Sequence, residues 1–153
     1  LCVVAGASSK DFSIPCSLVR SGVNTADPLG FGMDAEVAVN FVNGSAFDVL
    51  GQEGCVDDLL NQRNCFEVTR GGRPLKEFPT ESRFDTVVNF AAEDLLMSGW
   101  EKGSEHIATR SAMARVPHGN GDVVLYGFRP QFRGQPRGTY KLVFNALLGA
   151  TID

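Results

Sequence analysis

Few side chains in the sequence have the types and spacing that hydrolytic chemistry requires. A zinc hydrolase needs nitrogen or carboxylate ligands that converge on a metal ion with an open coordination position. The chain has two histidines, His106 and His118, and neither belongs to a His-Glu-x-x-His or His-x-x-Glu motif. We therefore expect no metal ligand, no cofactor-binding residue and no catalytic residue in this chain.

A catalytic serine or cysteine needs a base and an orienting group, and in many hydrolases it sits on a Gly-x-Ser-x-Gly turn. The sequence contains no such turn with either serine or cysteine at its centre. Cys16 follows a proline in the run Ile14-Pro15-Cys16-Ser17. We favour the interpretation that Cys16 is an ordinary residue at the end of a strand, and a catalytic role for Cys16 remains an alternative.

The four cysteines, Cys2, Cys16, Cys55 and Cys65, form no Cys-x-x-Cys motif. This spacing argues against zinc-knuckle and thioredoxin-like sites. A Cys55–Cys65 disulfide is allowed in an oxidising compartment. Free or buried thiols are the interpretation we favour, because a domain of this length does not need a disulfide to fold.

The most distinctive polar segment is RPQFRGQPRG, which precedes the expected C-terminal helix. Loops between a strand and a helix often face ligands in α/β sheets, and guanidinium groups suit carboxylates. A contact loop for an anion or a substrate tail is one interpretation. The one we favour is a loop held by Pro and Gly, whose arginines bind backbone carbonyls or the acidic first half of the chain. The candidate contact residues are Arg129, Gln131, Arg133, Gln135 and Arg137.

The composition is that of one soluble domain of 153 residues with a net charge of -4. An acidic protein of this kind is not expected to bind nucleic acid. The charge is uneven, since residues 1–98 carry -7 and residues 99–153 carry +3. No apolar run is long enough to span a membrane.

Strands are predicted where apolar residues alternate or run together. The Asn120-Gly121 dipeptide predicts a hairpin turn between the last two of them. The continuous apolar run 123–126 predicts a strand that is covered on both faces. The expected strands are 1–6, 14–23, 37–42, 65–69, 86–90, 112–116 and 123–128.

One helix is predicted at the C-terminus, with Thr139 as its N-terminal cap and Gly149 as its end. A short helical turn is expected at 94–97, and another around Leu59 and Leu60 in an irregular segment, 51–82. The apolar stripe of the C-terminal helix consists of Tyr140, Val143, Phe144, Leu147 and Leu148. Strands interspersed with helix predict an α/β fold with a mixed, mostly parallel sheet flanked by helices.

Several segments, in the same order along the chain, resemble the C-terminal end of bacterial zinc-carboxypeptidase-like proteins. One of them is the run Gly119–Gln135, GNGDVVLYGFRPQFRGQ, in which the segment Arg129–Gln135 is fairly specific. Cys16 and Asp27 depart from the pattern, at positions where glycine and histidine are expected. The other matching segments are Pro15–Arg20, Asp27–Met33, Ala46–Asp48, Ser98–Trp100, Gly138–Thr139 and Leu142–Leu148.

The resemblance implies that residues 1–153 form a single C-terminal accessory domain of a longer protein. It implies a class I glutamine-amidotransferase-like (flavodoxin-like) fold, which could be incomplete at its N-terminus, without an evident catalytic triad. The zinc ligands and the general base of that family belong to an N-terminal peptidase domain, so zinc is expected there and none of those residues is assigned here. The resemblance also implies export.

We therefore expect a non-catalytic accessory domain of a secreted or periplasmic zinc metallocarboxypeptidase, an enzyme class that hydrolyses peptides from the C-terminus. Its expected partner is the peptidase domain of the same protein, and self-association is compatible with the sequence. Two alternatives remain. One is an independent module that binds an anionic peptide or a cell-wall fragment through residues 129–137, and the other is a degenerate amidotransferase-like enzyme.

Overall fold

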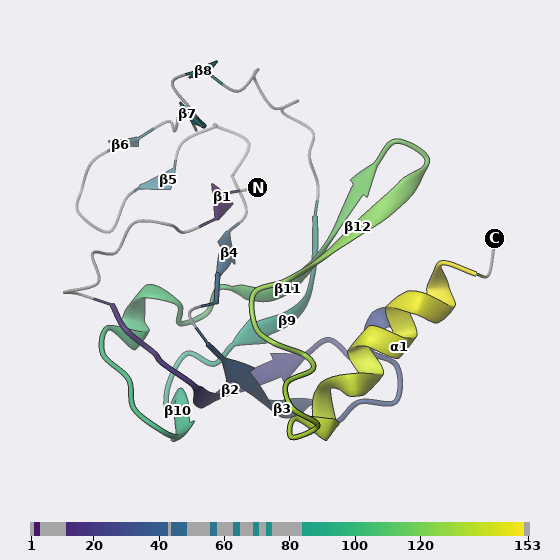
Figure 1. The fold of residues 1–153 in the computed structure, drawn as a ribbon. Helices are drawn as coiled ribbons and strands as arrows, with labels where there is room; N and C mark the ends of the chain where they lie inside the picture. The colour runs from purple at the N-terminus through teal and green to yellow at the C-terminus, as the bar shows by residue number, and fades with distance from the viewer. Residues whose placement is uncertain are drawn as a thin grey trace.

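In the part of the chain that the structure describes, the fold is built around a sheet of eight strands with one α-helix beside it (Figure 1). The computed structural model describes residues 2–3, 12–42, 44–48, 56–57, 63–64, 69–70, 73–74 and 84–151. The strands of the main sheet are β1 (Cys2–Val3), β2 (Ser17–Val23), β3 (Glu36–Phe41), β4 (Phe47–Asp48), β9 (Asp85–Phe90), β10 (Leu96–Ser98), β11 (Ser111–His118) and β12 (Gly121–Tyr126).

Two small two-stranded ladders lie in the middle of the sequence. In the first, β5 (Val56–Asp57) pairs with β6 (Arg63–Asn64), and in the second β7 (Thr69–Arg70) pairs with β8 (Arg73–Pro74). The helix predicted around residues 59–60 and the disulfide between residues 55 and 65 fall outside the described residues.

Each described pair of strands in the main sheet is antiparallel. The order is β1-β4-β11-β9-β2-β10, with β12 beside β11 and β3 beside β2. The sheet curls into a half-barrel. The prediction of a mostly parallel sheet flanked by helices, with an amidotransferase-like (flavodoxin-like) fold, is therefore wrong.

The connections explain why the sheet is antiparallel. Parallel neighbours need a crossover of a dozen or more residues, usually a helix. The described part of the chain has one α-helix, α1 (Tyr140–Gly149), and it follows the last strand, so it connects no two strands. The predicted hairpin is confirmed, because β11 and β12 are joined by a tight turn in which Gly119 has φ of 62°.

The core lies inside the curled sheet, and β2 shows how the sequence specifies it. Ser17, Val19, Ser21 and Val23 alternate inward and are buried, whereas Leu18 points outward and is exposed. A period of two is what a strand with one covered face requires. Phe41 from β3 meets Phe90 from β9 edge to face at 5.6 Å between ring centroids, and both are fully buried.

Two local predictions are wrong. The helical turn expected at 94–97 is strand β10, whose Leu96 pairs with Val19 along an otherwise open edge of β2. The last strand, β12, was expected to be covered on both faces, yet none of its six residues is buried and Val123 is 43% exposed. The first error arises because the partner of β10 is distant in the sequence. The second arises because the path of the whole chain decides whether a strand face is covered. Among the described residues, no helix is long and apolar enough to cross a membrane.

Candidate functional site

The loop between β12 and α1 holds the predicted contact residues, and backbone contacts close it at its base. The amide of Arg129 donates to the carbonyl of Asn40 in β3 at 3.0 Å. The buried hydroxyl of Thr139 lies 2.6 Å from the carbonyl of Pro130 and 2.9 Å from that of Pro136. The loop is therefore tied to the sheet at one end and to itself at the other.

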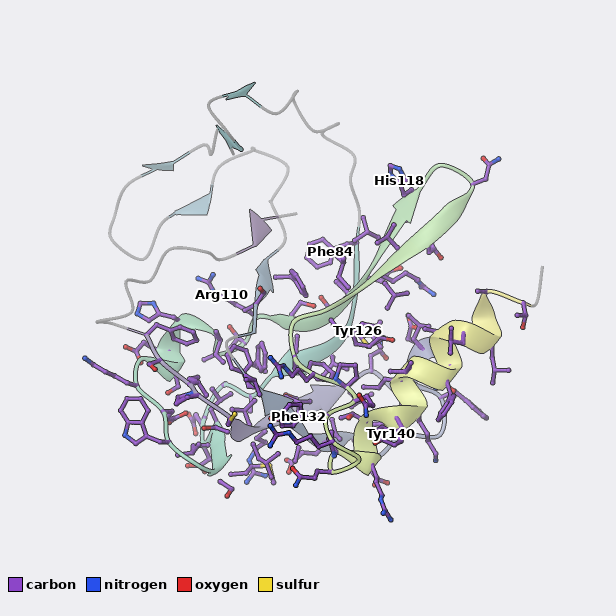
Figure 2. The ribbon with its side chains drawn as sticks, in the orientation of Figure 1. Phe84, Arg110, His118, Tyr126, Phe132 and Tyr140 are labelled. Atoms are coloured by element: carbon purple, nitrogen blue, oxygen red, sulfur yellow. The ribbon has the colours of Figure 1, made fainter. Side chains whose placement is uncertain are left out.

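Two arginines of this loop gather on one aromatic ring. The guanidinium carbon of Arg129 lies 5.0 Å from the centroid of the Phe132 ring, and that of Arg133 lies 4.9 Å from it. Such cation–π contacts hold the guanidinium groups against the ring. Figure 2 shows Phe132 on the loop near the start of α1, close to Tyr140.

The backbone at the tip of the loop is strained in a way that supports this arrangement. Arg133 has φ of 50° and Gly134 has φ of 70°, so two successive residues adopt left-handed conformations. The amide of Gln135 donates to the carbonyl of Phe132 at 2.9 Å, which closes a tight turn around them. Non-glycine residues adopt such angles only where their surroundings hold them there.

The structure brings together only part of the predicted set. Arg129 and Arg133 share the Phe132 ring, whereas Arg137 begins the short helix η3 (Arg137–Thr139). All five predicted residues are exposed. Within the described part of the chain, none of the three arginines forms an ion pair or donates a side-chain hydrogen bond, so the contacts to carbonyls and acidic residues that we favoured are not seen there.

The position of the loop in the sheet no longer argues for ligand binding. In a parallel sheet the loop would lie at the carboxyl edge, where ligands bind. In this antiparallel sheet it leads from the edge strand β12 to α1, so its position carries no such implication.

A second surface feature is the outer face of α1. Phe144, Leu147 and Leu148 are 58%, 61% and 59% exposed, although the sequence stripe placed them against the core. The helix is buried through Leu142 instead, with Ala146 packed against the core beside it. Thr139 occupies the predicted cap position but its hydroxyl caps no helical amide, and the helix includes Gly149.

Polar contacts fix the rotation of α1 that leaves this face outside. The Asn145 side chain donates to the carbonyls of Leu29 and Phe31 at 2.9 Å each, and the Lys141 ammonium donates to Gly32 at 2.6 Å. These contacts seat α1 on η1 (Pro28–Gly30), and the hydrogen bond from Asn145 to the Phe31 carbonyl places Phe31, which is 75% exposed, next to the helix. We call Phe31, Phe144, Leu147 and Leu148 the apolar face.

The Tyr126 hydroxyl donates to the carbonyl of Leu142 at 3.0 Å and ties β12 to α1. Burial raises the pKa of Tyr126 to about 12, because the charged phenolate is disfavoured away from water. The phenol therefore keeps its proton, and this donated hydrogen bond, throughout the physiological range.

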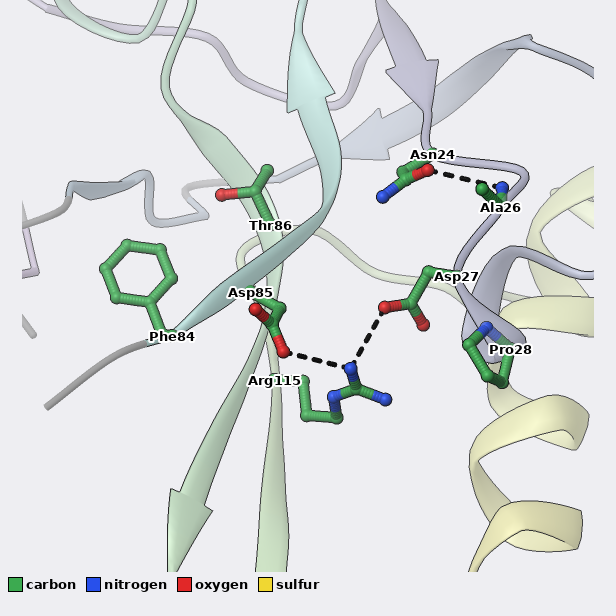
Figure 3. Close-up of a pocket in the computed structure, with 8 residues that line it drawn as sticks. All are labelled: Asn24, Ala26, Asp27, Pro28, Phe84, Asp85, Thr86 and Arg115. Carbon is green, nitrogen blue, oxygen red and sulfur yellow. Dashed lines mark hydrogen bonds and ion pairs between the residues drawn. The ribbon is translucent and has the colours of Figure 1, made fainter.

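An open polar pocket of about 470 Å³ lies where β9, β11 and the turn after β2 meet (Figure 3). Arg115 bridges two carboxylates there, at 2.9 Å from Asp85 and 3.2 Å from the mostly buried Asp27. The hydrogen bond to Asp85 and the charge of Asp27 raise the pKa of Arg115, although partial burial opposes them. Because all three charges are paired, this cluster holds strands together.

Asp27 also caps η1, since its carboxylate accepts a hydrogen bond from the amide of Leu29 at 2.9 Å. An Asp directly before Pro28 is a recognised signal for a helical start, so the cap could have been found in the sequence. The partnership with Arg115 could not, because the two residues meet only through the sheet.

The reactive residues considered in the sequence lie apart from these features. Cys16 is exposed with a free thiol and φ of 49°. The His106 ring meets the Phe12 ring edge to face at 6.1 Å, and His118 is exposed at the end of β11 (Figure 2). Among the described residues, no three His, Cys, Asp or Glu side chains group as metal ligands.

Comparison with known proteins identifies no relative: no protein-family model, no curated protein and no solved structure matches this chain.

Proposed function

We propose that this chain is a non-catalytic accessory domain of a secreted or periplasmic zinc-carboxypeptidase-like protein, and that it packs against the peptidase domain through its apolar face. The sequence resemblance supports the family and the export. The observation that carries the packing role is the exposure of Phe144, Leu147 and Leu148 on α1. Zinc and its ligands belong, in this proposal, to the peptidase domain.

The size of the apolar face suits a domain interface. From their exposed fractions, its four side chains present on the order of 400 Å² of apolar surface. Patches of this size on single domains often mark interaction sites. Interfaces between domains of one chain bury about 600–1,500 Å² in total, so the apolar face could supply most of one side.

The apolar face is also presented rigidly. Leu142 anchors α1 in the core, and Asn145 and Tyr126 tie it to η1 and β12. A surface that is already ordered loses little conformational entropy when a partner binds. The proposal does not depend on an amidotransferase-like fold, which the antiparallel sheet contradicts.

The test uses the full-length protein and the double variant Leu147→Ser/Leu148→Ser. We expect the variant to lower the melting temperature of the full-length protein and to expose the junction between the domains to limited proteolysis. The same variant should leave the melting temperature of the 153-residue chain nearly unchanged, because both leucines are already exposed.

Val123→Ser is the matched control, since Val123 is an exposed apolar residue on the β11–β12 hairpin, outside the apolar face. Val123→Ser should leave the melting temperatures of both the full-length protein and the 153-residue chain unchanged. An upstream reading frame without His-x-x-Glu and a later His would overturn the proposed family. Equal melting temperatures of the wild-type and double-variant full-length proteins would overturn the packing role.

A further inference from the structure

The pair Arg129 and Arg133 forms a concentration of positive charge on a protein of net negative charge. Residues 129–138 contain three arginines and no acidic residue, whereas the whole chain carries -4. Both guanidinium carbons lie about 5 Å from the Phe132 centroid, so they are within about 10 Å of each other. This is close to the screening length of physiological salt, so both charges act on the same bound anion.

The two guanidinium groups retain their hydrogen-bonding capacity. Each has five N–H donors in a planar fork, and among the described residues no side-chain or backbone acceptor is hydrogen-bonded to either fork. Stacking on Phe132 orients the planes but uses none of these donors. Arginines that serve only the fold usually pair with carboxylates or carbonyls, as Arg20 and Arg115 do here.

The backbone holds this pair in place before any ligand arrives. The left-handed turn at Arg133 closes the tip of the loop, and the two hydrogen-bond contacts of the buried Thr139 hydroxyl close its base. Preorganised donors bind more tightly than mobile ones because less entropy is lost. Strain at a non-glycine residue that also carries the charge points to a binding role rather than to a simple connection.

We propose that Arg129, Phe132 and Arg133 form a binding site for an acidic peptide segment. Alternate residues of an extended segment lie about 7 Å apart on the same side, so two such carboxylates can reach the two guanidinium groups at once. Phe132 contributes by keeping both guanidinium groups in this arrangement through its two cation–π contacts. Each guanidinium donates two parallel hydrogen bonds to one carboxylate.

The experiment measures binding of a fluorescein-labelled hexaglutamate peptide to the 153-residue chain by anisotropy, with hexaglutamine and inorganic phosphate as comparison probes. Hexaglutamate should bind and hexaglutamine should not. Arg129→Gln and Arg133→Gln should each weaken hexaglutamate binding about tenfold, as expected for the loss of a charge-assisted pair. Phe132→Leu, which leaves every charge in place, should also weaken it several-fold.

Arg137→Gln is the matched control, because it removes the same charge from the same loop but not from the Phe132 ring. It should weaken binding by no more than about twofold, the effect of a nearby charge in salt. Circular dichroism of each variant checks that it is folded.

The inference is overturned if hexaglutamate does not bind, or if Arg137→Gln weakens binding as much as Arg129→Gln. It is also overturned if Phe132→Leu has no effect, because the loop would then act only through net charge. Equal affinity for inorganic phosphate would overturn the assignment to peptide carboxylates. None of these outcomes depends on the proposed packing against a peptidase domain, since the apolar face contains none of these residues.

Discussion

At the scale of single residues, the backbone angles show at which positions glycine is favoured. Cys16 has φ of 49°, a conformation that glycine adopts most readily, and glycine is the residue that the resemblance leads us to expect there. Gly99 has φ of 110°, and a Cβ atom at this position would lie 2.6 Å from Ser17 Oγ. That hydroxyl donates to the Trp100 carbonyl at 2.7 Å and accepts from the Trp100 amide at 3.0 Å, so Gly99 lets the segment lie against β2.

Replacing Cys16 with glycine should therefore stabilise the protein. Relief of the left-handed strain exceeds the extra entropy of glycine in the unfolded chain. We expect Cys16→Gly to have a free energy of unfolding about 1 kcal/mol higher than Cys16→Ala, which keeps the Cβ atom. Urea denaturation followed by tryptophan fluorescence measures both. Equal midpoints for the two variants would show that the backbone at Cys16 is unstrained.

At the scale of elements, α1 is amphipathic in a way that its sequence stripe alone does not reveal. All five residues of the expected stripe are exposed or partly exposed, whereas the fully buried side chain is Leu142. Asn145 and Lys141 favour this rotation, because their side chains must point toward η1 to donate hydrogen bonds to the carbonyls there. The rotation of α1 therefore combines these hydrogen bonds with the burial of Leu142.

Two leucines of α1 provide a matched comparison. Leu142→Ala should lower the free energy of unfolding by about 2–5 kcal/mol, because it opens a cavity under a fully buried side chain. Leu147→Ala should change it by less than about 0.5 kcal/mol, because that side chain is mostly exposed. Thermal denaturation of the 153-residue chain tests both. Equal destabilisation of the two variants would contradict the rotation of α1 that buries Leu142 and exposes Leu147.

At the scale of the whole molecule, stability is concentrated in the middle of the curled sheet. Strands β2, β9 and β11 each pair on both edges, and their inward residues are nearly all buried. Strand β12 pairs with β11 among the described strands and its first half is exposed. Such differences in burial and pairing separate the parts of a protein that open only on global unfolding from those that open locally.

Amide hydrogen exchange should follow this order. The amides of Val19, Val88 and Ala114 in the central strands should exchange last, at rates set by global unfolding. Those near Val123 should exchange much faster, because the end of the hairpin can open by itself. Exchange measured by mass spectrometry or NMR on the 153-residue chain distinguishes the two groups. Equal protection of β12 and β9 would mean that the hairpin is covered by another part of the chain.

The local elements could be predicted from the sequence. Apolar alternation, β-branched residues and turn chemistry predicted β2, β3, β9 and the β11–β12 hairpin, and period 3.6 predicted α1. These patterns are local, since a strand or helix must match its own apolar period to the surface it covers. The Arg129–Arg137 loop was also recognisable, because Pro, Gly and repeated Arg are visible without any partner.

How these elements combine depends on tertiary contacts. Pairing direction depends on which edges are free, so β10 became a strand on the open edge of β2 and the sheet became antiparallel. The meeting of Arg115 with Asp27, and the rotation of α1 that exposes Phe144, depend on contacts between distant segments. A single sequence records which residues are apolar or charged, whereas the closest approach of two side chains is set by the path of the whole backbone.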